Sequence, residues 1–190
     1  MRKMIYALMA LVMMFCGTGC SLKKKFSSNG KSIVTISGQM ARHDYVDLGL
    51  ESGTKWATYN VGATKPTEYG DYFAWGETEL KEVYNWDTYK YGVGSGFDLD
   101  SITKYNMSGK YGIIDSLSVL LPEDDAATAN WGSAWRMPTE EELEELIDGC
   151  EWKWVNDFNG SGVNGRLGTS KSNGSTIFLP AAGYRYYAGN

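Results

Sequence analysis

The chain contains little histidine and little cysteine: one histidine and three cysteines among 190 residues. A Ser–His–Asp triad or a Cys–His pair needs a histidine inside the folded domain, and a zinc site built from imidazoles needs several. His43, the single histidine, lies where the expected domain begins. The sequence therefore predicts no catalytic residue of these kinds, and we expect neither a bound metal nor a cofactor.

The cysteines are too few and too scattered for a disulfide framework. Cys16 and Cys20 lie near the N-terminus, and Cys150 is alone in the remainder of the chain. No disulfide can therefore form inside the domain, even in an oxidising compartment. Cys150 follows Gly149 at an expected helix end, so we interpret it as a packed thiol rather than a reactive one.

The sequence also lacks an excess of basic residues, a long apolar run and much proline. Lys and Arg number 18 against 23 Asp and Glu, and this balance argues against a nucleic-acid partner. The apolar stretch 4–15 is too short to span a bilayer comfortably. Four prolines beside 23 glycines and 14% aromatic residues indicate a turn-rich, aromatic-rich globular domain.

The N-terminus has the pattern of a targeting segment. Arg2 and Lys3 precede the apolar stretch 4–15, and the small residues of 17–19 lead to Cys20. This pattern resembles a bacterial lipoprotein signal, with Gly17 standing where Leu is usual. It implies that residues 1–19 are a signal peptide and that Cys20 carries the lipid. The alternative, an ordinary secretory signal cut near the same place, has the same consequence for export.

The segment after Cys20 is polar and includes a run of three lysines, residues 23–25. We interpret residues 20–42 as the lipidated cysteine and a flexible tether, with a possible short first strand at 33–36. The lysine run could contact anionic head groups, but a solvated tether is the simpler interpretation. The domain proper is then residues 43–190.

The clearest secondary-structure signal is a helix start near Thr139. Thr139 and Glu142 form a T-x-x-E capping box, and Leu143, Leu146 and Ile147 fall on one apolar face. This pattern predicts a helix near 139–148. Pro122, followed by acidic residues, predicts a second, short helix near 122–130.

The other signals are short strands separated by turns. Residues 80–121 carry weak signals, and the glycine-rich run 92–96 is interpreted as a loop rather than a phosphate cradle. Asn173-Gly174 is typical of a β-hairpin. Together the patterns predict an α+β fold of short, twisted antiparallel strands, one or two helices and long loops. The expected strands lie near 45–50, 55–62, 71–77, 151–155, 166–172 and 176–180.

Four ordered blocks, from residue 45 to the end of the chain, resemble one known family. They are Tyr45-Val-Asp-Leu-Gly-Leu with Trp56-Ala-Thr and Asn60-Val-Gly-Ala, Tyr69-Gly-Asp-Tyr-Phe-Ala-Trp-Gly-Glu, Trp131-Gly with Trp135-Arg-Met-Pro-Thr, and Phe178-Leu-Pro-Ala-Ala-Gly-Tyr-Arg. These blocks are similar to the Fibrobacter succinogenes major paralogous domain of Bacteroidetes envelope lipoproteins. The chain departs from the family at Glu51, where Pro is expected, and at Tyr59, where Cys is common.

The resemblance implies a C-type-lectin-like fold, distantly similar to formylglycine-generating enzymes. Those enzymes use a pair of cysteines, which Cys150 alone does not supply. Family members continue past Gly-Tyr-Arg, so the resemblance also implies that this chain misses C-terminal strands. In the lectin-like fold the ligand face is built from C-terminal loops.

Candidate binding residues follow from this resemblance and from the residue types. Tyr and Arg are enriched at binding hot spots, which favours Tyr184, Arg185, Tyr186 and Tyr187 as ligand-binding residues. The alternative is that these four residues pack in the core or are disordered. The aromatic residues expected in the core are Trp56, Trp75, Trp131 and Trp135.

The acidic run Glu123, Asp124 and Asp125 has two interpretations. Carboxylates can ligate Ca²⁺, but consecutive acids at a helix start usually interact with the helix dipole. We favour the second interpretation and leave cation binding open.

These observations predict a non-enzymatic envelope protein, anchored in the bilayer through acylated Cys20, that binds a glycan or a protein. The anchor would hold it in the outer membrane, on the periplasmic or the surface face. Two alternatives stay open. One is a structural envelope protein without a specific ligand, and the other is a degenerate formylglycine-generating-type enzyme.

Overall fold

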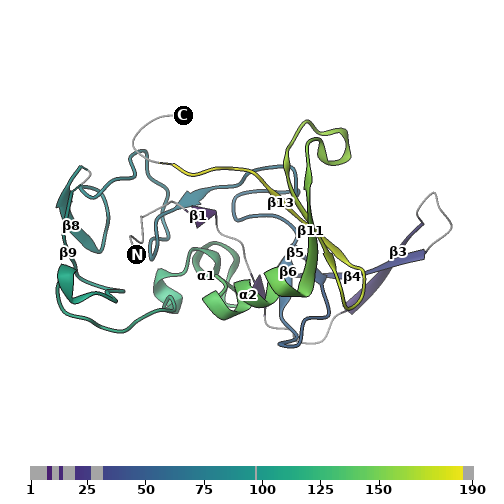
Figure 1. The fold of residues 1–190 in the computed structure, drawn as a ribbon, viewed down its shortest axis with the longest axis horizontal. Helices are drawn as coiled ribbons and strands as arrows, with labels where there is room; N and C mark the ends of the chain where they lie inside the picture. Colours follow the sequence, from purple (N-terminus) through teal and green to yellow (C-terminus); the bar gives the residue numbers. More distant parts are fainter. Residues whose placement is uncertain (1–7, 10–12, 15–19, 27–31, 97, 186–190) are drawn as a thin grey trace.

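The computed structural model describes residues 8–9, 13–14, 20–26, 32–96 and 98–185 (Figure 1). Within them, short antiparallel strands outnumber helices, and the chain is of mixed α and β structure, as the sequence patterns predict. Figure 1 shows the β3–β4 hairpin projecting at one end of the molecule and the β8–β9 hairpin at the opposite end.

The largest sheet is antiparallel throughout and has the strand order β10-β2-β6-β5-β4-β3. Its strands, in chain order, are β2 (Met13–Met14), β3 (Cys20–Phe26), β4 (Ser32–Met40), β5 (His43–Asp47), β6 (Lys55–Ala57) and β10 (Trp135–Arg136). β2, near the start of the described chain, thus lies beside β10, which is far from it in sequence.

This central sheet has a core cluster on each of its faces. Successive side chains of a strand point in opposite directions, so neighbouring residues of β5 belong to different clusters. Tyr45 of β5 packs in one core cluster, which also contains Trp135 and the helical Trp131. The next residue, Val46, packs in a second cluster with Trp56 and with residues of the C-terminal half. The prediction of buried tryptophans is confirmed at positions 56, 131 and 135, whereas Trp75 is half-buried with its ring edge-on to Tyr105.

A second sheet has the order β11-β12-β13 and contains the predicted hairpin. Its strands are β11 (Cys150–Val155), β12 (Gly165–Ser170) and β13 (Thr176–Pro180). Asn173 lies in the five-residue connection 171–175, where its side-chain amide donates to the Asp47 carbonyl (2.9 Å) and its side-chain oxygen accepts from the Ser175 N–H (2.9 Å). The asparagine therefore fixes the turn and also ties this hairpin to β5.

The remaining elements are small. Two two-stranded sheets pair β1 (Leu8–Met9) with β7 (Tyr72–Phe73) and β8 (Gly92–Ser95) with β9 (Asp98–Ile102). The helices are η1 (Gly109–Tyr111), η2 (Pro122–Asp124), α1 (Ala126–Trp131), α2 (Glu140–Gly149) and η3 (Phe158–Gly160), where η denotes a 3₁₀-helix.

The predicted helix start at Thr139 is confirmed. Thr139 caps α2 with a full capping box, in which its hydroxyl accepts from the Glu142 N–H and Glu142 accepts from the Thr139 N–H. The predicted apolar stripe is partly wrong, since Leu146 is buried but Ile147 is 59% exposed. Leu146 and Cys150 are four residues apart, and both pack in the second cluster with Leu143 at its edge. This packing turns position 147 away from the core.

The predicted short helix near 122–130 is confirmed as two pieces. Pro122–Asp124 forms η2, and Asp125 then caps α1 by accepting from the Thr128 N–H (2.9 Å). The carboxylate of Asp125 also accepts from the Met137 N–H (2.7 Å), which holds the approach to α2 against the start of α1.

Two paired strands lie within residues 20–42, for which the sequence predicts a flexible tether with one possible short strand. β3 pairs over its whole length with residues 32–38 of β4, and β4 pairs on its other side with β5. The β-branched run 33–36 supplies the strand propensity, and it outweighs the polar residues around it. β1 and β2 also place backbone of the expected signal segment in sheets, while its removal by cleavage stays a prediction.

The glycine-rich run 92–96 is not a loop, because β8 covers most of it and pairs with β9. Gly94 faces the partner strand so closely that a Cβ there would lie 2.2 Å from the Asp98 carbonyl oxygen. The strand is thus built on small residues that allow close approach of two backbones. Hydrophobic alternation, the signal used to find strands, is absent from it.

Candidate functional site

Of the predicted ligand residues, Arg185 lies against a residue of β7. Tyr184 is 62% exposed, and the Arg185 guanidinium lies 5.3 Å from the centre of the Tyr72 ring. Tyr186 and Tyr187 lie outside the described residues. The structure therefore brings Arg185 onto an aromatic ring of the fold, as a cation–π contact within the chain.

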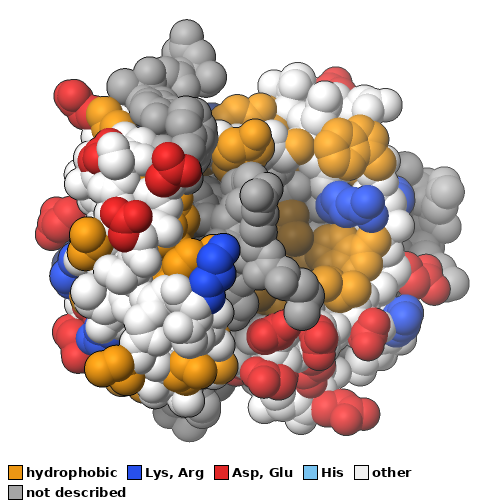
Figure 2. Space-filling model, turned by 60° about the vertical axis from the view of Figure 1, so that its left-hand side comes forward, with side chains coloured by type: hydrophobic (Ala, Val, Ile, Leu, Met, Phe, Trp, Pro, Cys, Tyr) orange, Lys and Arg blue, Asp and Glu red, His pale blue; other side chains and the backbone are white. Residues whose placement is uncertain are grey.

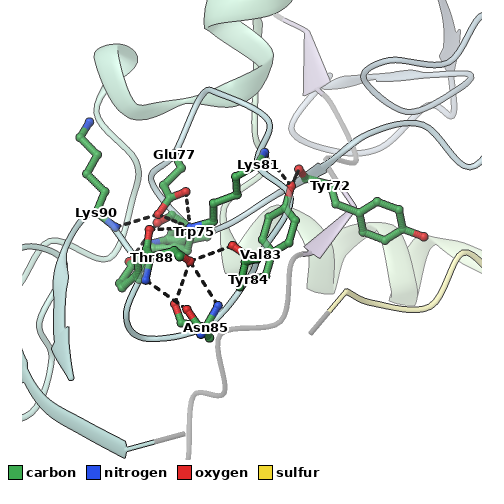
Figure 3. Close-up of polar contacts among 10 residues, drawn as sticks. Tyr72, Trp75, Glu77, Lys81, Val83, Tyr84, Asn85, Thr88 and Lys90 are labelled. Atoms are coloured by element: carbon green, nitrogen blue, oxygen red, sulfur yellow. Dashed lines mark hydrogen bonds and ion pairs between the residues drawn. The ribbon is translucent and has the colours of Figure 1, made fainter. Parts of the chain in front are cut away.

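Tyr72 anchors the C-terminal segment to the middle of the domain. Its hydroxyl donates to the Ala182 carbonyl (2.6 Å), and its own carbonyl accepts from the hydroxyl of Tyr84 (2.6 Å; Figure 3). Tyr84 is buried with Tyr89 and Ala74 in a third core cluster. Through Tyr72 and Tyr84, the segment around Ala182 is thus connected to the segment 77–91, which contributes to an extended polar network.

The centre of this network is a set of five charged residues, which we call the lysine–carboxylate cluster: Glu77, Lys81, Lys90, Lys104 and Asp124. Its two carboxylates are buried, with residue exposures of 8% for Glu77 and 2% for Asp124. Buried carboxylates need both charge partners and hydrogen bonds. The three lysines supply the charges.

Asp124 receives four donors. The ammonium groups of Lys90 (3.1 Å) and Lys104 (2.5 Å) contact it, and so do the hydroxyls of Tyr105 (2.8 Å) and Tyr91. Each ammonium also lies about 5 Å from the centre of the Tyr91 ring. Asp124 therefore ties segments around residues 90 and 104 to the turn before α1.

Glu77 organises the other half of the cluster (Figure 3). Its carboxylate contacts the Lys81 ammonium at 2.7 Å and accepts from the backbone N–H of Lys90 at 2.8 Å. Figure 3 shows the Lys90 side chain leading away from Glu77, so that Lys90 links the two carboxylates with its two ends. Thr88 closes the loop by accepting and donating hydrogen bonds with Asn85 and Val83.

The contacts around Asp124 shift the pKa values of several groups in the cluster and beside it. Burial alone would raise the pKa of Asp124, but the hydrogen bonds from Lys104, Tyr91, Tyr105 and Lys90 outweigh it and hold that pKa well below its usual range. Hydrogen bonds to Tyr91 and Asp124 raise the pKa of Lys90, and burial raises the pKa of Tyr89. These shifts favour the charged forms of Asp124 and Lys90 and the neutral form of Tyr89.

A hollow of about 220 Å³ lies beside the cluster. Five polar residues line it, largely through the apolar atoms of their side chains: Glu77, Thr78, Glu79, Thr88 and Lys90. Glu79, Thr88 and Lys90 are exposed, with the Thr88 hydroxyl donating to the Val83 carbonyl and the Lys90 ammonium contacting Asp124. A second hollow, of about 210 Å³, lies around the stacked rings of Phe158 and Phe178 and is also lined by Thr58 and Pro66.

The acidic run divides into three different roles. Asp125 caps α1, as the dipole interpretation predicts, whereas Asp124 belongs to the lysine–carboxylate cluster and Glu123 is exposed. Within the described residues no three His, Cys, Asp or Glu side chains are grouped so that they could hold a metal ion.

Across the face drawn in Figure 2, Asp and Glu side chains gather in patches with Lys and Arg scattered between them.

The single histidine and the lone thiol are both packed. The His43 ring stacks on Trp131 with centroids 4.0 Å apart, and burial lowers its pKa. Cys150 is 4% exposed in the second core cluster, and burial raises its pKa, which confirms the packed interpretation of this thiol.

Sequence reasoning missed the lysine–carboxylate cluster because residues 80–121 lack hydrophobic periodicity. A signal was nevertheless present: the dipeptide Lys-Tyr occurs at 90–91, 104–105 and 110–111, and at each place the ammonium lies within 5.4 Å of the centre of the neighbouring ring. The buried position of Asp124, by contrast, follows from tertiary packing alone.

None of the helices in the described ranges is both long enough and apolar enough to cross a membrane. Comparisons of the chain with protein-family models, with curated proteins and with solved structures find no match.

Proposed function

We propose that this chain is an exported, lipid-anchored envelope protein whose C-type-lectin-like domain binds a glycan and catalyses no reaction. The observation that carries the export half is the N-terminal pattern of Arg2 and Lys3, a short apolar stretch and small residues before Cys20. The observation that carries the binding half is the polar hollow beside the lysine–carboxylate cluster.

The lectin-like fold is supported by where the four resembling blocks lie. The first contributes Tyr45 and Val46 to β5, and the third contributes Trp135 to β10, all of them buried. The second supplies Phe73 of β7, and the fourth supplies Phe178 of β13, also buried. The shared residue types therefore coincide with the core of an antiparallel α+β domain, which is where a common fold would require them.

The hollow suits a sugar, because polar residues line it and also present apolar atoms to it. Sugar hydroxyls both donate and accept hydrogen bonds, and the exposed Glu79, Thr88 and Lys90 lie at its edge, while Glu77 is buried in contact with Lys81. Hydrogen bonds within the lysine–carboxylate cluster already hold Glu77 and Lys90 in place, so ligand binding would order few additional side chains. A protein ligand remains the alternative, through the exposed Tyr184 nearby.

The anchor is tested by Cys20→Ser in a bacterial host. We expect this variant to lose incorporation of labelled palmitate and to leave the detergent phase for the aqueous phase. Cys150→Ser is the matched control, because Cys150 is buried in the domain and should carry no lipid. Palmitate on the Cys20→Ser variant would refute the anchor.

The ligand site is tested by Glu79→Ala, with Glu82→Ala as the control. Both glutamates are exposed and lie in the same segment, but only Glu79 lines the hollow. We expect Glu79→Ala to weaken retention on a glycan array about tenfold, the loss of one charge-assisted hydrogen bond. Equal retention of both variants would place the ligand elsewhere, and no retention of the unmodified chain would favour a structural protein.

A further inference from the structure

The strand β2 occupies an unusual position in the central sheet. It lies between β6 and β10 and pairs antiparallel with both, Met13 opposite Trp56 and Arg136, and Met14 opposite Lys55 and Trp135. The two tryptophans of its neighbours are both fully buried, in different core clusters on the two faces of the sheet. The position of β2 is therefore interior on both faces.

The same segment also completes a second sheet. β1, three residues before β2, pairs antiparallel with β7 through Leu8 opposite Phe73 and Met9 opposite Tyr72. Residues 8–14 of the chain, Leu-Met-Ala-Leu-Val-Met-Met, contain no charged residue. One short apolar stretch thus supplies strands to three different neighbours.

The walls on either side of β2 are held independently of it. β6 pairs on its other side with β5. β10 is fixed by the turn after α1: the Trp135 N–H donates to the Gly132 carbonyl (3.0 Å), and the Trp135 carbonyl accepts from the Thr128 hydroxyl (2.8 Å). The indole N–H of Trp135 donates to the Met40 carbonyl (3.2 Å). The gap between β6 and β10 is therefore preformed.

Cleavage before Cys20, which is part of the proposed function, removes both β1 and β2. It leaves an interior sheet position empty, with the backbone edges of β6 and β10 facing each other across it. The backbone N–H and C=O groups along these two edges need hydrogen-bond partners inside the core. A polypeptide strand can pair with both edges at once, and a glycan cannot.

We propose that the gap between β6 and β10 is a strand-acceptor site, filled in the cleaved protein by a short, extended, uncharged apolar segment from a partner polypeptide. The register of β2 indicates the chemistry of the occupant: it runs antiparallel to both walls, and each wall has a buried tryptophan opposite it. The inference rests on the proposed cleavage.

The test uses the full chain with a protease site in place of residues 16–19 and Cys20→Ser, made without export. After nicking, we expect the N-terminal fragment to stay bound on gel filtration in detergent-free buffer. Refolding from urea with excess synthetic peptide 8–14, extended by two C-terminal lysines, should replace the fragment and restore the melting temperature of the nicked complex. The same peptide with Met13→Pro is the control, since proline lacks the backbone N–H and should bind at least about tenfold more weakly.

Three results would overturn the proposal. The fragment could separate while the rest of the chain keeps its melting temperature, which means that β6 and β10 close the gap themselves. The remaining chain could dimerise and refuse the peptide, which makes a second copy the occupant. It could also stay unfolded with the peptide present. This assay needs no membrane, so it can succeed even where the test of palmitate on Cys20 fails.

Discussion

Replacing Leu146 by alanine is expected to lower the free energy of unfolding of the full chain by about 3 kcal/mol. Leu146 is 1% exposed on α2 and packs in the cluster that contains Trp56 of the central sheet and Ile177 of the second sheet. Removing its side chain leaves a cavity where the helix and two sheets meet. Urea unfolding followed by tryptophan fluorescence measures the change.

The neighbouring residue provides the matched control. Ile147 is on the same helix and 59% exposed, so Ile147→Ala should change the free energy of unfolding by no more than about 0.5 kcal/mol. If the two substitutions lowered the free energy of unfolding equally, that result would contradict the orientation of α2. The comparison matters because the sequence pattern alone assigns both residues to the buried face.

Replacing Asp124 by alanine is expected to destabilise the chain by about 3 kcal/mol, as when one partner of a buried ion pair is removed. The ammonium groups of Lys90 and Lys104 would lose their carboxylate, and the hydroxyls of Tyr91 and Tyr105 would lose an acceptor. Half of Lys90 is exposed and can find water, which limits the cost. Glu123→Ala, one residue away and exposed, is the control and should be nearly neutral.

The destabilisation caused by Asp124→Ala is expected to depend on pH. The pKa of Asp124 is depressed in the folded chain, so its contribution is fully present above its unfolded pKa of about 3.9 and is lost as the pH falls below it. The stability difference between the unmodified chain and Asp124→Ala should be constant from about pH 7 to pH 5 and shrink below about pH 4. A difference independent of pH down to pH 3 would mean that packing, not charge, holds Asp124 in place.

Local sequence signals predicted the parts of the fold whose causes are local. The capping box at Thr139, the proline before α1 and the Asn-Gly hairpin each depend on a few neighbouring residues, and each is found in the structure. Sequence failed where the cause is a contact between distant segments. The strand at β8 depends on the approach of Asp98 to Gly94, and the exposure of Ile147 depends on how α2 lies on two sheets.

The candidate site was harder to predict than the fold. Of the four proposed ligand residues, Arg185 lies against the Tyr72 ring, and no local pattern reveals that contact. The role of Asp124 depends on lysines 20 and 34 residues earlier in the chain, whose approach only the folded structure establishes. The residue types of Glu123, Asp124 and Asp125 suggested an interaction with the helix dipole. Tertiary packing instead places Asp124 in the lysine–carboxylate cluster.

The covering of the central sheet on both faces has a consequence for how the domain opens. The backbone amides of Tyr45 and Val46 lie on a strand that is paired on both sides and shielded above and below. Water can reach them only when helix, hairpin and sheet separate together, whereas the β8–β9 hairpin pairs with no third strand among the described residues. Strand β5 is therefore the last part of the domain to exchange its hydrogens, and any event that exposes it is unfolding of the whole domain.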